Sequence, residues 1–261
     1  MYKVIFSDLD GTLLTDDKKI CQKNIDAINK AKQKGVKFVF CTGRLPYCYD
    51  MFENDIDLSN AVSTNGTIVY SDGELIKSKY LIKEDARKII EYGIKNNEYE
   101  RIFTFDYLYL LNPEKGGSDV NFYKKSKGVT HKEALDILEN KDIYKLSFHA
   151  DHNHLLEIRK DIEVLGLTID LVFSHPEFLE MIYKGESKGK GIEDYCLNNN
   201  IKLEETIGVG DEENDESMLK TVGLACCPSN AKDSVKEISD YVTSADNNDG
   251  AIAEIIEKYV I

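Results

Sequence analysis

The chain has 261 residues, of which 42% are hydrophobic and 31% are charged, and its formal net charge is −14. This composition allows a large core and excludes a disordered chain, and the length is comfortable for two domains. The acidic balance disfavours nucleic acid and anionic membranes as partners, so an anionic ligand would need a locally positive site.

The first part of the chain alternates short apolar runs with a helical pattern. Residues 3–7 are predicted to form a strand, and Asn24 to Lys34 a helix, because that segment has an apolar stripe and Gly35 just beyond its end. Two further strands are expected in KFVFCTGR and AVSTNG, and each ends in a small polar residue plus glycine. A hairpin is expected in TIVYSDGELIKS. The hairpin is expected to turn at Asp72-Gly73.

The middle of the chain mixes helices and strands differently, which predicts a separate α+β domain of roughly a hundred residues. Its helices are expected at Glu84 to Asn96, His131 to Glu139 and His154 to Leu165. Its strands are expected in RIFTFDYLYLLN, at Ile143 to Phe148, Thr168 to Phe173 and Leu179 to Tyr183. A polar loop is expected from Pro113 to Gly128.

After the middle block the first pattern returns. Helices are expected at Gly191 to Asn198, Asp215 to Thr221, Ala231 to Ile238 and Ala251 to Tyr259, and strands in TIGVGD, GLACC and YVTS. Strands that alternate with helices predict an α/β fold with a parallel, doubly wound sheet. The sheet is therefore expected to be split in sequence, with core segments 1–82 and 185–261 and an inserted domain at 83–184.

Polar residues and glycines follow four of the strands predicted for the core. Ligands of an open parallel sheet bind beyond the carboxyl ends of its strands, so these endings are expected to meet at one edge. They are Asp8-Leu9-Asp10-Gly11, Thr42-Gly43, Thr64-Asn65-Gly66 and Gly210-Asp211.

The acidic residues at this edge point to a bound cation. Asp8, Asp10, Asp211 and Asp215 would bring about four negative charges together, which is strongly unfavourable unless they are neutralised. Carboxylates and water suit Mg²⁺ better than Zn²⁺, and Mg²⁺ in turn favours substrate phosphates.

Groups suited to phosphate oxygens occur at the same strand ends. They are the Thr42 hydroxyl, backbone N–H groups near Gly43 and the ammonium group of Lys188 in ESKGKG. Glycines at positions 11, 43 and 210 would let the backbone approach a ligand closely.

The runs DLDGTLL, CTGR, SKGKG and GVGDEENDESML match, in this order, the four motifs of the haloacid dehalogenase superfamily of phosphatases, which the chain resembles. The later DGAIAEII and the large insertion between the second and third motifs resemble its Cof-type branch with a C2-type α/β cap. The resemblance implies a Rossmann-like doubly wound parallel sheet core with an inserted α+β cap domain. One departure is CCPSNA, which stands where the family often has a Met-Gly-Asn-Ala-like run.

The resemblance also implies catalytic and metal-binding roles. Asp8 would be the nucleophile that forms an aspartyl-phosphate, and Asp10 would protonate the leaving alcohol and then activate the hydrolytic water. Mg²⁺ would be bound by Asp8, Asp211 and the backbone carbonyl of Asp10. Asp215 would support the waters of the metal or Lys188.

The resemblance further implies that Thr42 and Lys188 hold the phosphoryl oxygens and that Asn214 positions the phosphate or Lys188. Thr42 could also be a helix N-cap, and Lys190 is an alternative to Lys188 because both lie in the same lysine-rich run. Arg44 could reach the substrate or could be a surface residue at a helix start.

The cysteines and the N-terminus indicate the compartment. The six cysteines contain no C-x-x-C pair, which is typical of reduced thiols in a cytoplasmic protein. The adjacent Cys226 and Cys227 fit a buried strand better than a redox or metal pair. The short apolar run at the N-terminus does not resemble a signal peptide, and no segment approaches the length of a membrane span, so we expect a cytoplasmic protein without a membrane partner.

Two further groups of residues have alternative interpretations. The histidines of HADHNH, which are His149, His152 and His154, could bind a metal, but we expect an exposed loop of the cap. Four aromatic residues of the cap could line its substrate face or form its core. They are Tyr107, Tyr109, Phe122 and Tyr123.

Together these features predict a Mg-dependent phosphoric monoester hydrolase that acts on small phosphorylated metabolites, such as sugar phosphates or phosphorylated cofactors. One alternative is a phosphomutase of the same fold, which phosphate release without a sugar acceptor would exclude. Another is a non-enzymatic phosphate-binding regulatory protein, such as a receiver domain, although receiver domains are far shorter and have no cap.

Overall fold

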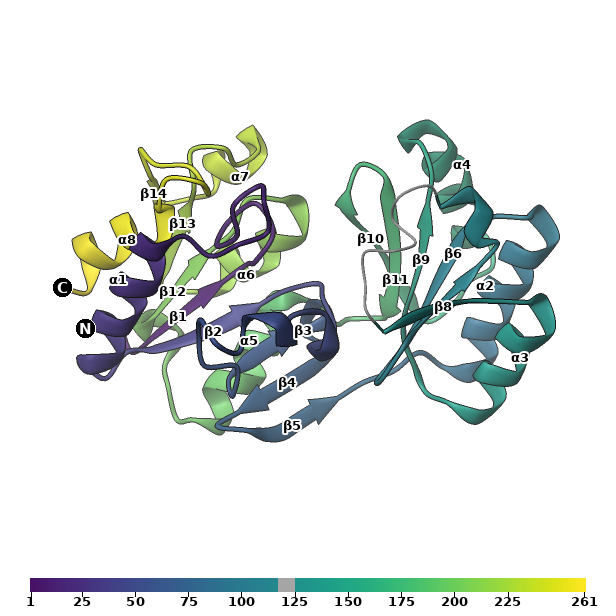
Figure 1. Ribbon diagram of the computed structural model, residues 1–261, viewed down its shortest axis with the longest axis horizontal. Coiled ribbons are helices and arrows are strands. Elements are labelled where there is room, and N and C mark those ends of the chain that lie inside the picture. The colour runs from purple at the N-terminus through teal and green to yellow at the C-terminus, as the bar shows by residue number, and fades with distance from the viewer. Residues whose placement is uncertain (117–124) are drawn as a thin grey trace. The chain divides into compact units, whose positions relative to one another are not determined.

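The computed structural model describes residues 1–116 and 125–261, and its contacts divide the chain into two compact units (Figure 1). The first unit consists of Met1–Arg44, Tyr49–Ser78 and Ser187–Ile261. The second consists of Leu45–Cys48 and Lys79–Glu186, so most of it is inserted between two parts of the first.

The first unit is built on an eight-stranded sheet with the order β14-β13-β12-β1-β2-β3-β4-β5. Neighbouring strands from β14 to β3 are parallel, while β3, β4 and β5 are joined antiparallel at one edge. The strands are β1 (Val4–Ser7), β2 (Lys37–Cys41), β3 (Ala61–Ser63), β4 (Ile68–Ser71), β5 (Glu74–Ser78), β12 (Thr206–Val209), β13 (Leu224–Cys227) and β14 (Tyr241–Val242).

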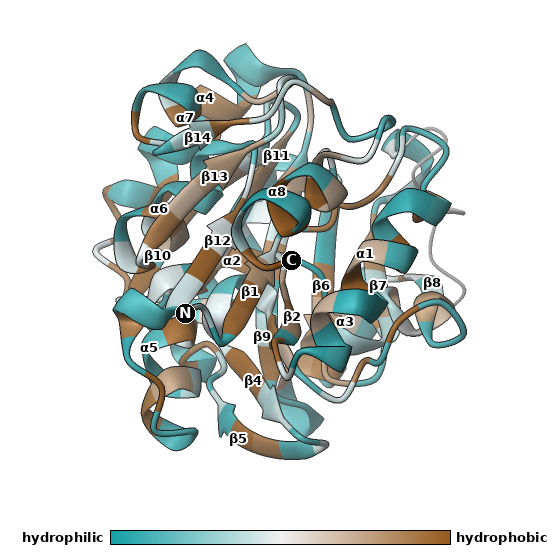
Figure 2. Cartoon of the chain, turned by 90° about the vertical axis from the view of Figure 1, so that its left-hand side faces the viewer, coloured by the Kyte–Doolittle hydropathy of each residue, from teal (hydrophilic) through white to brown (hydrophobic). Residues whose placement is uncertain are grey.

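Helices cover both faces of this sheet, because successive strand residues point to opposite faces. Ile5 of β1 packs in one cluster with residues of α1 and α8, and its neighbours Val4 and Phe6 pack in another with residues of α5 and α6. Figure 2 shows the apolar segments of β1, β12 and β13 among these helices. The helices are α1 (Gln22–Gln33), α5 (Lys188–Asn198), α6 (Glu216–Thr221), α7 (Asp233–Glu237) and α8 (Ala251–Tyr259).

The second unit contains a sheet with the order β10-β11-β9-β6-β7-β8. Among its described strand pairs, β7 and β8 are parallel and the others antiparallel. One face of this sheet packs in a hydrophobic cluster with its three helices. The elements are α2 (Lys83–Asn96), β6 (Glu100–Thr104), β7 (Leu108–Leu111), β8 (Ser126–Val129), α3 (His131–Asn140), β9 (Ile143–His149), α4 (His152–Glu163), β10 (Ile169–His175) and β11 (Phe178–Tyr183).

Local sequence signals explain where the helices of the second unit begin and end. Thr130 and Glu133 form a capping box at the start of α3, in which each side chain bonds the backbone N–H of the other residue. Asp151 caps α4 by accepting a hydrogen bond from the N–H of His154 at 3.2 Å. Helix α2 ends where Asn97 adopts a left-handed conformation, with φ of 55°.

The predicted fold class is confirmed: a Rossmann-like doubly wound parallel sheet carries an inserted α+β domain. The loop predicted from Pro113 to Gly128 is wrong at its end, because Ser126–Val129 pairs with β7 as strand β8. Residues 117–124 of that loop lie outside the described residues.

The expectation of an exposed loop for HADHNH is also wrong. His149 is the last residue of β9, and His152 and His154 lie in the first turn of α4. The Asp151 cap starts the helix within the histidine-rich run, which sequence periodicity alone had placed two residues later.

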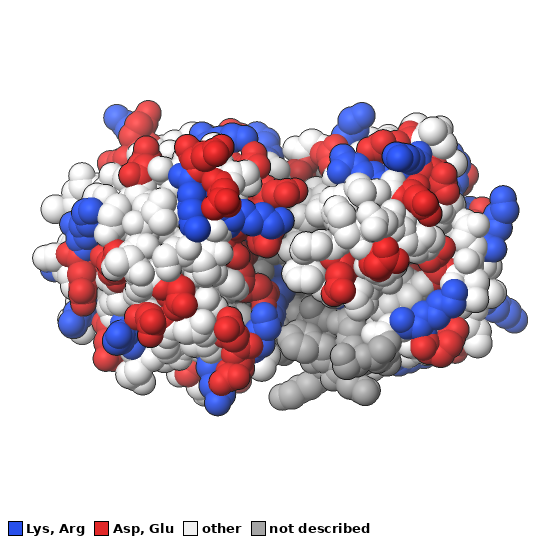
Figure 3. Space-filling view, turned by 90° about the horizontal axis from the view of Figure 1, so that it is seen from above, with Lys and Arg blue, Asp and Glu red and all other residues white. Residues whose placement is uncertain are grey.

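Charged side chains of both signs are interspersed on the face seen in Figure 3. None of the described helices combines the length and the apolarity that a membrane crossing requires.

Candidate active site

The loops that follow β1, β2 and β12 carry all the predicted site residues except Lys188, at the carboxyl end of the first unit's sheet. Strand β1 lies between β2 and β12, so Asp8, directly after β1, is central. The N–H of Asp8 continues the parallel ladder by donating to the carbonyl oxygen of Val209 at 2.9 Å. The sheet topology thus places a carboxylate between two neighbouring strand ends.

Lys188 joins two of the aspartates. It is the first residue of α5 and is 0% exposed, and its Nζ lies 2.6 Å from Asp8 Oδ1 and 2.5 Å from Asp215 Oδ1. The N-cap of α5 is Ser187, whose hydroxyl accepts a hydrogen bond from the N–H of Lys190 at 3.1 Å. Lys190 itself is exposed and paired with Glu193 at 2.8 Å. Of the two candidate lysines, Lys188 is therefore the one that lies among the carboxylates.

The loop after β12 orients Asp211. The Thr12 hydroxyl donates to Asp211 Oδ1 at 2.5 Å, and Asp215 Oδ2 accepts from the N–H groups of Asp211 and Glu212 at 2.9 and 3.0 Å. Gly11 has φ of +78°, and a Cβ there would collide with the Asp211 carboxylate. The glycine after Asp10 is thus required both by its backbone conformation and by the close approach of Asp211.

Charge and burial strongly perturb this cluster. Burial raises the pKa of Asp8 to about 7, although Lys188 acts to lower it. Burial and the charges of Asp8 and Asp215 raise the pKa of Asp211 to about 8. Burial acts to lower the pKa of Lys188, but Asp215 and Asp8 outweigh it and hold that pKa above its usual value. The cluster therefore has more negative charge than one ammonium group compensates.

The carboxylates fit a divalent cation. Ligand oxygens of Asp8, Asp211 and Asp215 lie within 4.8 Å of one another. Both Asp215 oxygens accept hydrogen bonds, whereas Asp8 and Asp211 each use one oxygen in the described contacts. One oxygen of Asp8 and one of Asp211 thus have no described partner, and hard oxygen donors of this kind suit Mg²⁺. Asp215 instead supports Lys188 and the loop of Asp211.

Asp10 has a different environment from Asp8. Its carboxylate forms a two-pronged pair with Arg44, with both N···O distances at 2.7 Å, and a further contact with Lys18 at 2.8 Å. Burial acts to raise the pKa of Asp10, but Arg44 and Lys18 outweigh it and lower the pKa to about 2. That burial is partial, because 41% of the Asp10 side chain is still exposed to solvent. Two carboxylates two residues apart therefore have pKa values shifted in opposite directions, the pattern of groups with distinct roles.

Four predicted phosphate-binding residues are joined through one another and Asn65 and reach Asp10 through Arg44; they are Thr42, Gly43, Arg44 and Asn214. Thr42 is buried, and its hydroxyl accepts a hydrogen bond from the N–H of Arg44 at 3.1 Å. Gly43 packs against Asn65, and Asn214 Nδ2 donates to Asn65 Oδ1 at 3.3 Å. Arg44 lies on the Asp10 carboxylate rather than being a surface residue at a helix start.

The sequence interpretation missed two residues that the structure brings to the site, since Lys18 pairs with Asp10 and Thr12 bonds Asp211. It placed Asn65 in a strand ending at this edge but assigned it no role, and the structure shows that Asn65 joins Gly43 to Asn214. Thr12 lies inside DLDGTLL and Asn65 in a strand ending, so their positions were visible in the sequence, although their contacts were not.

The adjacent cysteines, the histidine-rich run and the two described aromatic candidates are not part of the aspartate cluster. Cys226 and Cys227 are free, buried thiols of strand β13, as expected. His154 contacts Glu98 at 3.1 Å in an ion pair of the second unit. Tyr109 belongs to the hydrophobic cluster of that unit and Tyr107 packs against it. Phe122 and Tyr123 lie outside the described residues.

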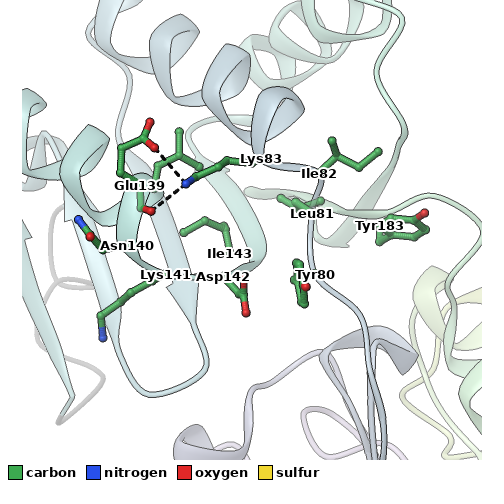
Figure 4. A pocket seen from close by; sticks show the side chains of 11 residues that line it. Tyr80, Leu81, Ile82, Lys83, Glu139, Asn140, Lys141, Asp142, Ile143 and Tyr183 are labelled. Carbon is green, nitrogen blue, oxygen red and sulfur yellow. Dashed lines mark hydrogen bonds and ion pairs between the residues drawn. The ribbon is translucent and has the colours of Figure 1, made fainter.

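A pocket in the second unit contains none of the predicted site residues. Its cavity of about 370 Å³ lies between the start of α2, the end of α3 and the start of β9 (Figure 4). Within the pocket, Lys83 Nζ lies 3.0 Å from the Glu139 carboxylate and donates to the Glu139 carbonyl oxygen at 2.7 Å. Lys141, which also lines it, is paired with Asp106 at 2.9 Å. The aspartate cluster is the stronger candidate for a phosphate site, because it combines a buried lysine with carboxylates that could hold a cation.

Known families match nearly the whole chain. The model of a family described as haloacid dehalogenase-like hydrolase matches residues 5–256. Phosphatase YwpJ of Bacillus subtilis is 27% identical over 278 residues, covering 95% of this chain and 96% of that protein. The 5-amino-6-(5-phospho-D-ribitylamino)uracil phosphatase YcsE of the same organism is 29% identical over 267 residues, covering 99% and 96%.

The structural comparison extends over both units. A solved haloacid dehalogenase-like hydrolase from B. subtilis superposes with a TM-score of 0.86 at 27% identity. The match covers 99% of this chain and 100% of that one.

Proposed function

Because the chain belongs to the haloacid dehalogenase-like hydrolases and is a phosphatase of their Cof-type branch, we propose that it hydrolyses small phosphorylated metabolites through an aspartyl-phosphate on Asp8. The observation that carries the proposal is the buried group of Asp8, Asp211 and Asp215 around Lys188. Such a group supplies a nucleophile, a place for a cation and a fixed positive charge for phosphoryl oxygens.

The proposed reaction has two steps. First, the Asp8 carboxylate attacks phosphorus, the bond to the leaving oxygen breaks, and Asp10 donates its proton to the leaving alcohol. Next, water attacks the phosphorus of the aspartyl-phosphate, Asp10 accepts a proton from that water, and phosphate and the free Asp8 carboxylate are released. Asp10 is ionised in the environment described, so we propose that the nearby phosphoryl charge raises its pKa and lets it hold the first proton.

Asp8 and Asp211, with the backbone carbonyl of Asp10, would hold Mg²⁺. Bound there, the cation would supply positive charge that lowers the pKa of both carboxylates and neutralises phosphoryl oxygens. Lys188, which lies beside Asp8, would bind phosphoryl oxygens, and the Thr42 hydroxyl and the Gly43 N–H would complete the set. Asn214 would position the phosphate.

The proposed substrates are phosphate monoesters of small molecules, such as sugar phosphates or phosphorylated cofactors. The relative named for a phosphoribitylaminouracil supports this class, since that compound is a phosphorylated sugar alcohol joined to a heterocycle. The chain's net charge of −14 supports a small ligand over nucleic acid.

We also propose that residues 83–184 form a cap domain between core segments 1–82 and 185–261 and that the cap selects the leaving group. The sheet of the second unit carries a buried charged pair, in which Lys145 Nζ lies 2.7 Å from Glu180 Oε1 and 4.6 Å from the centre of the Phe103 ring. Charged groups beside aromatic rings are suited to binding a polar small molecule.

A panel of metabolite phosphoesters, assayed for phosphate release with Mg²⁺ and with a chelator, tests the function. We expect turnover of several esters with Mg²⁺, without any sugar acceptor, and none with the chelator. Turnover only with a phosphorylated sugar as acceptor would instead identify a phosphomutase. No turnover of any ester would favour a phosphate-binding regulatory protein.

Asp10→Asn should lower phosphate release from alkyl phosphates by about 10²–10⁴-fold, the usual contribution of general acid–base catalysis. The loss should be much smaller for release of nitrophenol from p-nitrophenyl phosphate in a single turnover, because nitrophenolate leaves without being protonated. Burst kinetics on both esters measure the difference. Equal losses on the two esters would contradict the acid role of Asp10.

Stabilisation of the protein by Mg²⁺ should increase between about pH 5 and about pH 8. The folded-state pKa values of Asp8 and Asp211, about 7 and about 8, are raised above the ordinary value of 3.8, so the metal-free fold binds protons there. The stability that these bound protons give the metal-free fold is fully present below the ordinary carboxyl pKa, and it is lost as pH rises through the folded-state pKa values. In that upper range Mg²⁺ replaces the protons and restores stability.

Thermal unfolding with Mg²⁺ or a chelator, at matched ionic strength, measures this effect. Asp211→Asn is the matched variant, and the pH-dependent increase should largely disappear in it. An Mg²⁺ effect that is independent of pH in the unmodified protein would contradict proton displacement at these carboxylates.

A further inference from the structure

The turn Thr64–Gly66, directly after β3, has an unusual backbone. Thr64, Asn65 and Gly66 have φ of 52°, 52° and 91°, so three successive residues are left-handed. Asparagine and glycine tolerate this region, but a β-branched threonine rarely adopts it. Thr64 is 0% exposed and Asn65 is 2% exposed. Backbone strain of this kind persists only where the surroundings enforce it, and it is concentrated at functional sites.

The turn is bonded to the loop that carries Thr42. The N–H of Asn65 donates to the Thr42 carbonyl oxygen at 3.1 Å, and the N–H of Thr64 donates to the Arg44 carbonyl oxygen at 3.0 Å. A Cβ at Gly43 would lie 3.1 Å from Asn65 Oδ1, so the Asn65 side chain packs directly on the Gly43 backbone. The left-handed conformation therefore directs two N–H groups and one side chain onto the same loop.

The turn also touches the two other loops of the site. Asn65 Oδ1 accepts a hydrogen bond from Asn214 Nδ2 at 3.3 Å. Gly66 lies so close to the start of α5 that a Cβ would collide with the carbonyl oxygen of Ser187, the residue before Lys188. One three-residue turn thus contacts the segments of Thr42, Lys188 and Asn214, which come from three distant parts of the chain.

We propose that Thr64–Gly66 is a positioning turn for the phosphoryl group and that Asn65 is its central positioning residue. The turn sets the spacing between the Thr42–Gly43 loop, the start of α5 and Asn214 without itself contacting the reacting atoms. Phosphoryl transfer depends on the placement of such groups, so a small displacement lowers the rate. This inference rests on the proposed phosphatase function and assigns a role to a segment outside the four motifs.

Asn65→Gly tests the proposal, because glycine keeps the left-handed backbone and removes only the side chain. Asn200→Gly is the matched control, since Asn200 has φ of 53° and is exposed after α5. We expect Asn65→Gly to lower kcat/KM by about 10–100-fold and by the same factor for esters with different leaving groups. Orthovanadate, a mimic of the transferring phosphoryl group, should bind more weakly by a similar factor. The control should match the unmodified protein in both measurements.

A coupling measurement separates positioning from general damage to the fold. If Asn65 acts by holding Asn214, the double variant Asn65→Gly/Asn214→Ala should lose no more than the worse single variant. Additive losses would overturn the link to Asn214. An Asn65→Gly variant equal to the control, or losses that differ between leaving groups, would overturn the proposal as a whole.

Vanadate affinity is measured through stabilisation against thermal unfolding and needs no turnover. Inactivity of the unmodified protein on all esters would therefore contradict the proposed function, while the comparison of vanadate binding would still test the turn.

Should Asn65→Gly fail to fold, Asn65→Asp retains the shape and the acceptor oxygen. Its added negative charge should lower vanadate affinity by about tenfold or more, and an unchanged affinity would show that Asn65 does not lie beside the phosphoryl site.

Discussion

Asp8→Asn should lower steady-state phosphate release by at least about 10⁴-fold, the scale of losses when a catalytic nucleophile is removed. Asp8 lies at the centre of the sheet edge, beside Lys188 at 2.6 Å, while Asp10 is held by Arg44 and Lys18 and Asp211 by Thr12. An amide nitrogen and oxygen occupy the same volume as the carboxylate but form no stable acyl phosphate.

The same substitution should leave the fold intact. Lys188 retains Asp215 at 2.5 Å as a partner, and loss of the Asp8 charge removes one source of the raised pKa of Asp211. We therefore expect the free energy of unfolding to change by no more than about 1–2 kcal/mol. Phosphate release and urea denaturation, measured on the same preparation, separate the two effects.

Asp17→Asn is the matched control, because Asp17 follows the same motif and is exposed. It should keep full activity. Residual turnover in Asp8→Asn within tenfold of the unmodified protein would remove Asp8 as the nucleophile, and a protein that is inactive because it is unfolded would be recognised by its denaturation curve.

The central part of the site could be predicted because it depends on topology. Strands that alternate with helices predict a parallel sheet, and the carboxyl ends of parallel strands share one edge, so Asp8 and Asp211 were expected at the same edge. The structure adds that β1 and β12 are neighbours. Their carboxylates are distant in the sequence, yet strand order brings them within reach of a shared cation.

The choice between two lysines could not be made in this way. Lys188 and Lys190 are two positions apart, about 200° around a helix, so the residue at which the helix begins decides which of them is buried. The Ser187 cap sets that start, and the capping signal was hidden in a run rich in glycine and lysine.

Side-chain partners and backbone strain were also beyond the sequence pattern. Arg44 could be placed after a strand, but its two-pronged contact with Asp10 depends on how two loops meet. The residues TNG indicate a turn in any protein. Tertiary contacts, which the sequence does not show, give Thr64 its left-handed conformation and bond it to the loop of Thr42.

Lys188→Met should destabilise the protein by about 3–5 kcal/mol at about pH 8 in a chelator, because it leaves buried carboxylates without their cation. Methionine has a similar length and no charge. Lys188 is 0% exposed and contacts Asp8 and Asp215, with Asp211 in the same cluster. The variant should also lose nearly all activity, since the positive charge beside the phosphoryl group is removed.

The sign of the pH dependence identifies the cause. Without Lys188, the folded-state pKa values of Asp8 and Asp211 rise further above their ordinary value, so the protonated fold is stable at low pH and loses stability as pH rises. The deficit should therefore shrink towards about pH 5, where the groups are protonated. Mg²⁺ should restore part of the stability at high pH without restoring turnover, because it replaces a neutralising charge but not the group that holds phosphoryl oxygens.

Lys190→Met is the control that makes this result specific. Lys190 is exposed and its pair with Glu193 lies at the surface, so its loss should change stability by no more than about 0.5 kcal/mol and leave activity unchanged. Urea denaturation at two pH values, with chelator and with Mg²⁺, compares the two variants. Equal losses in both, or a Lys188→Met deficit that grows as pH falls, would contradict a buried ammonium group that balances Asp8 and Asp215.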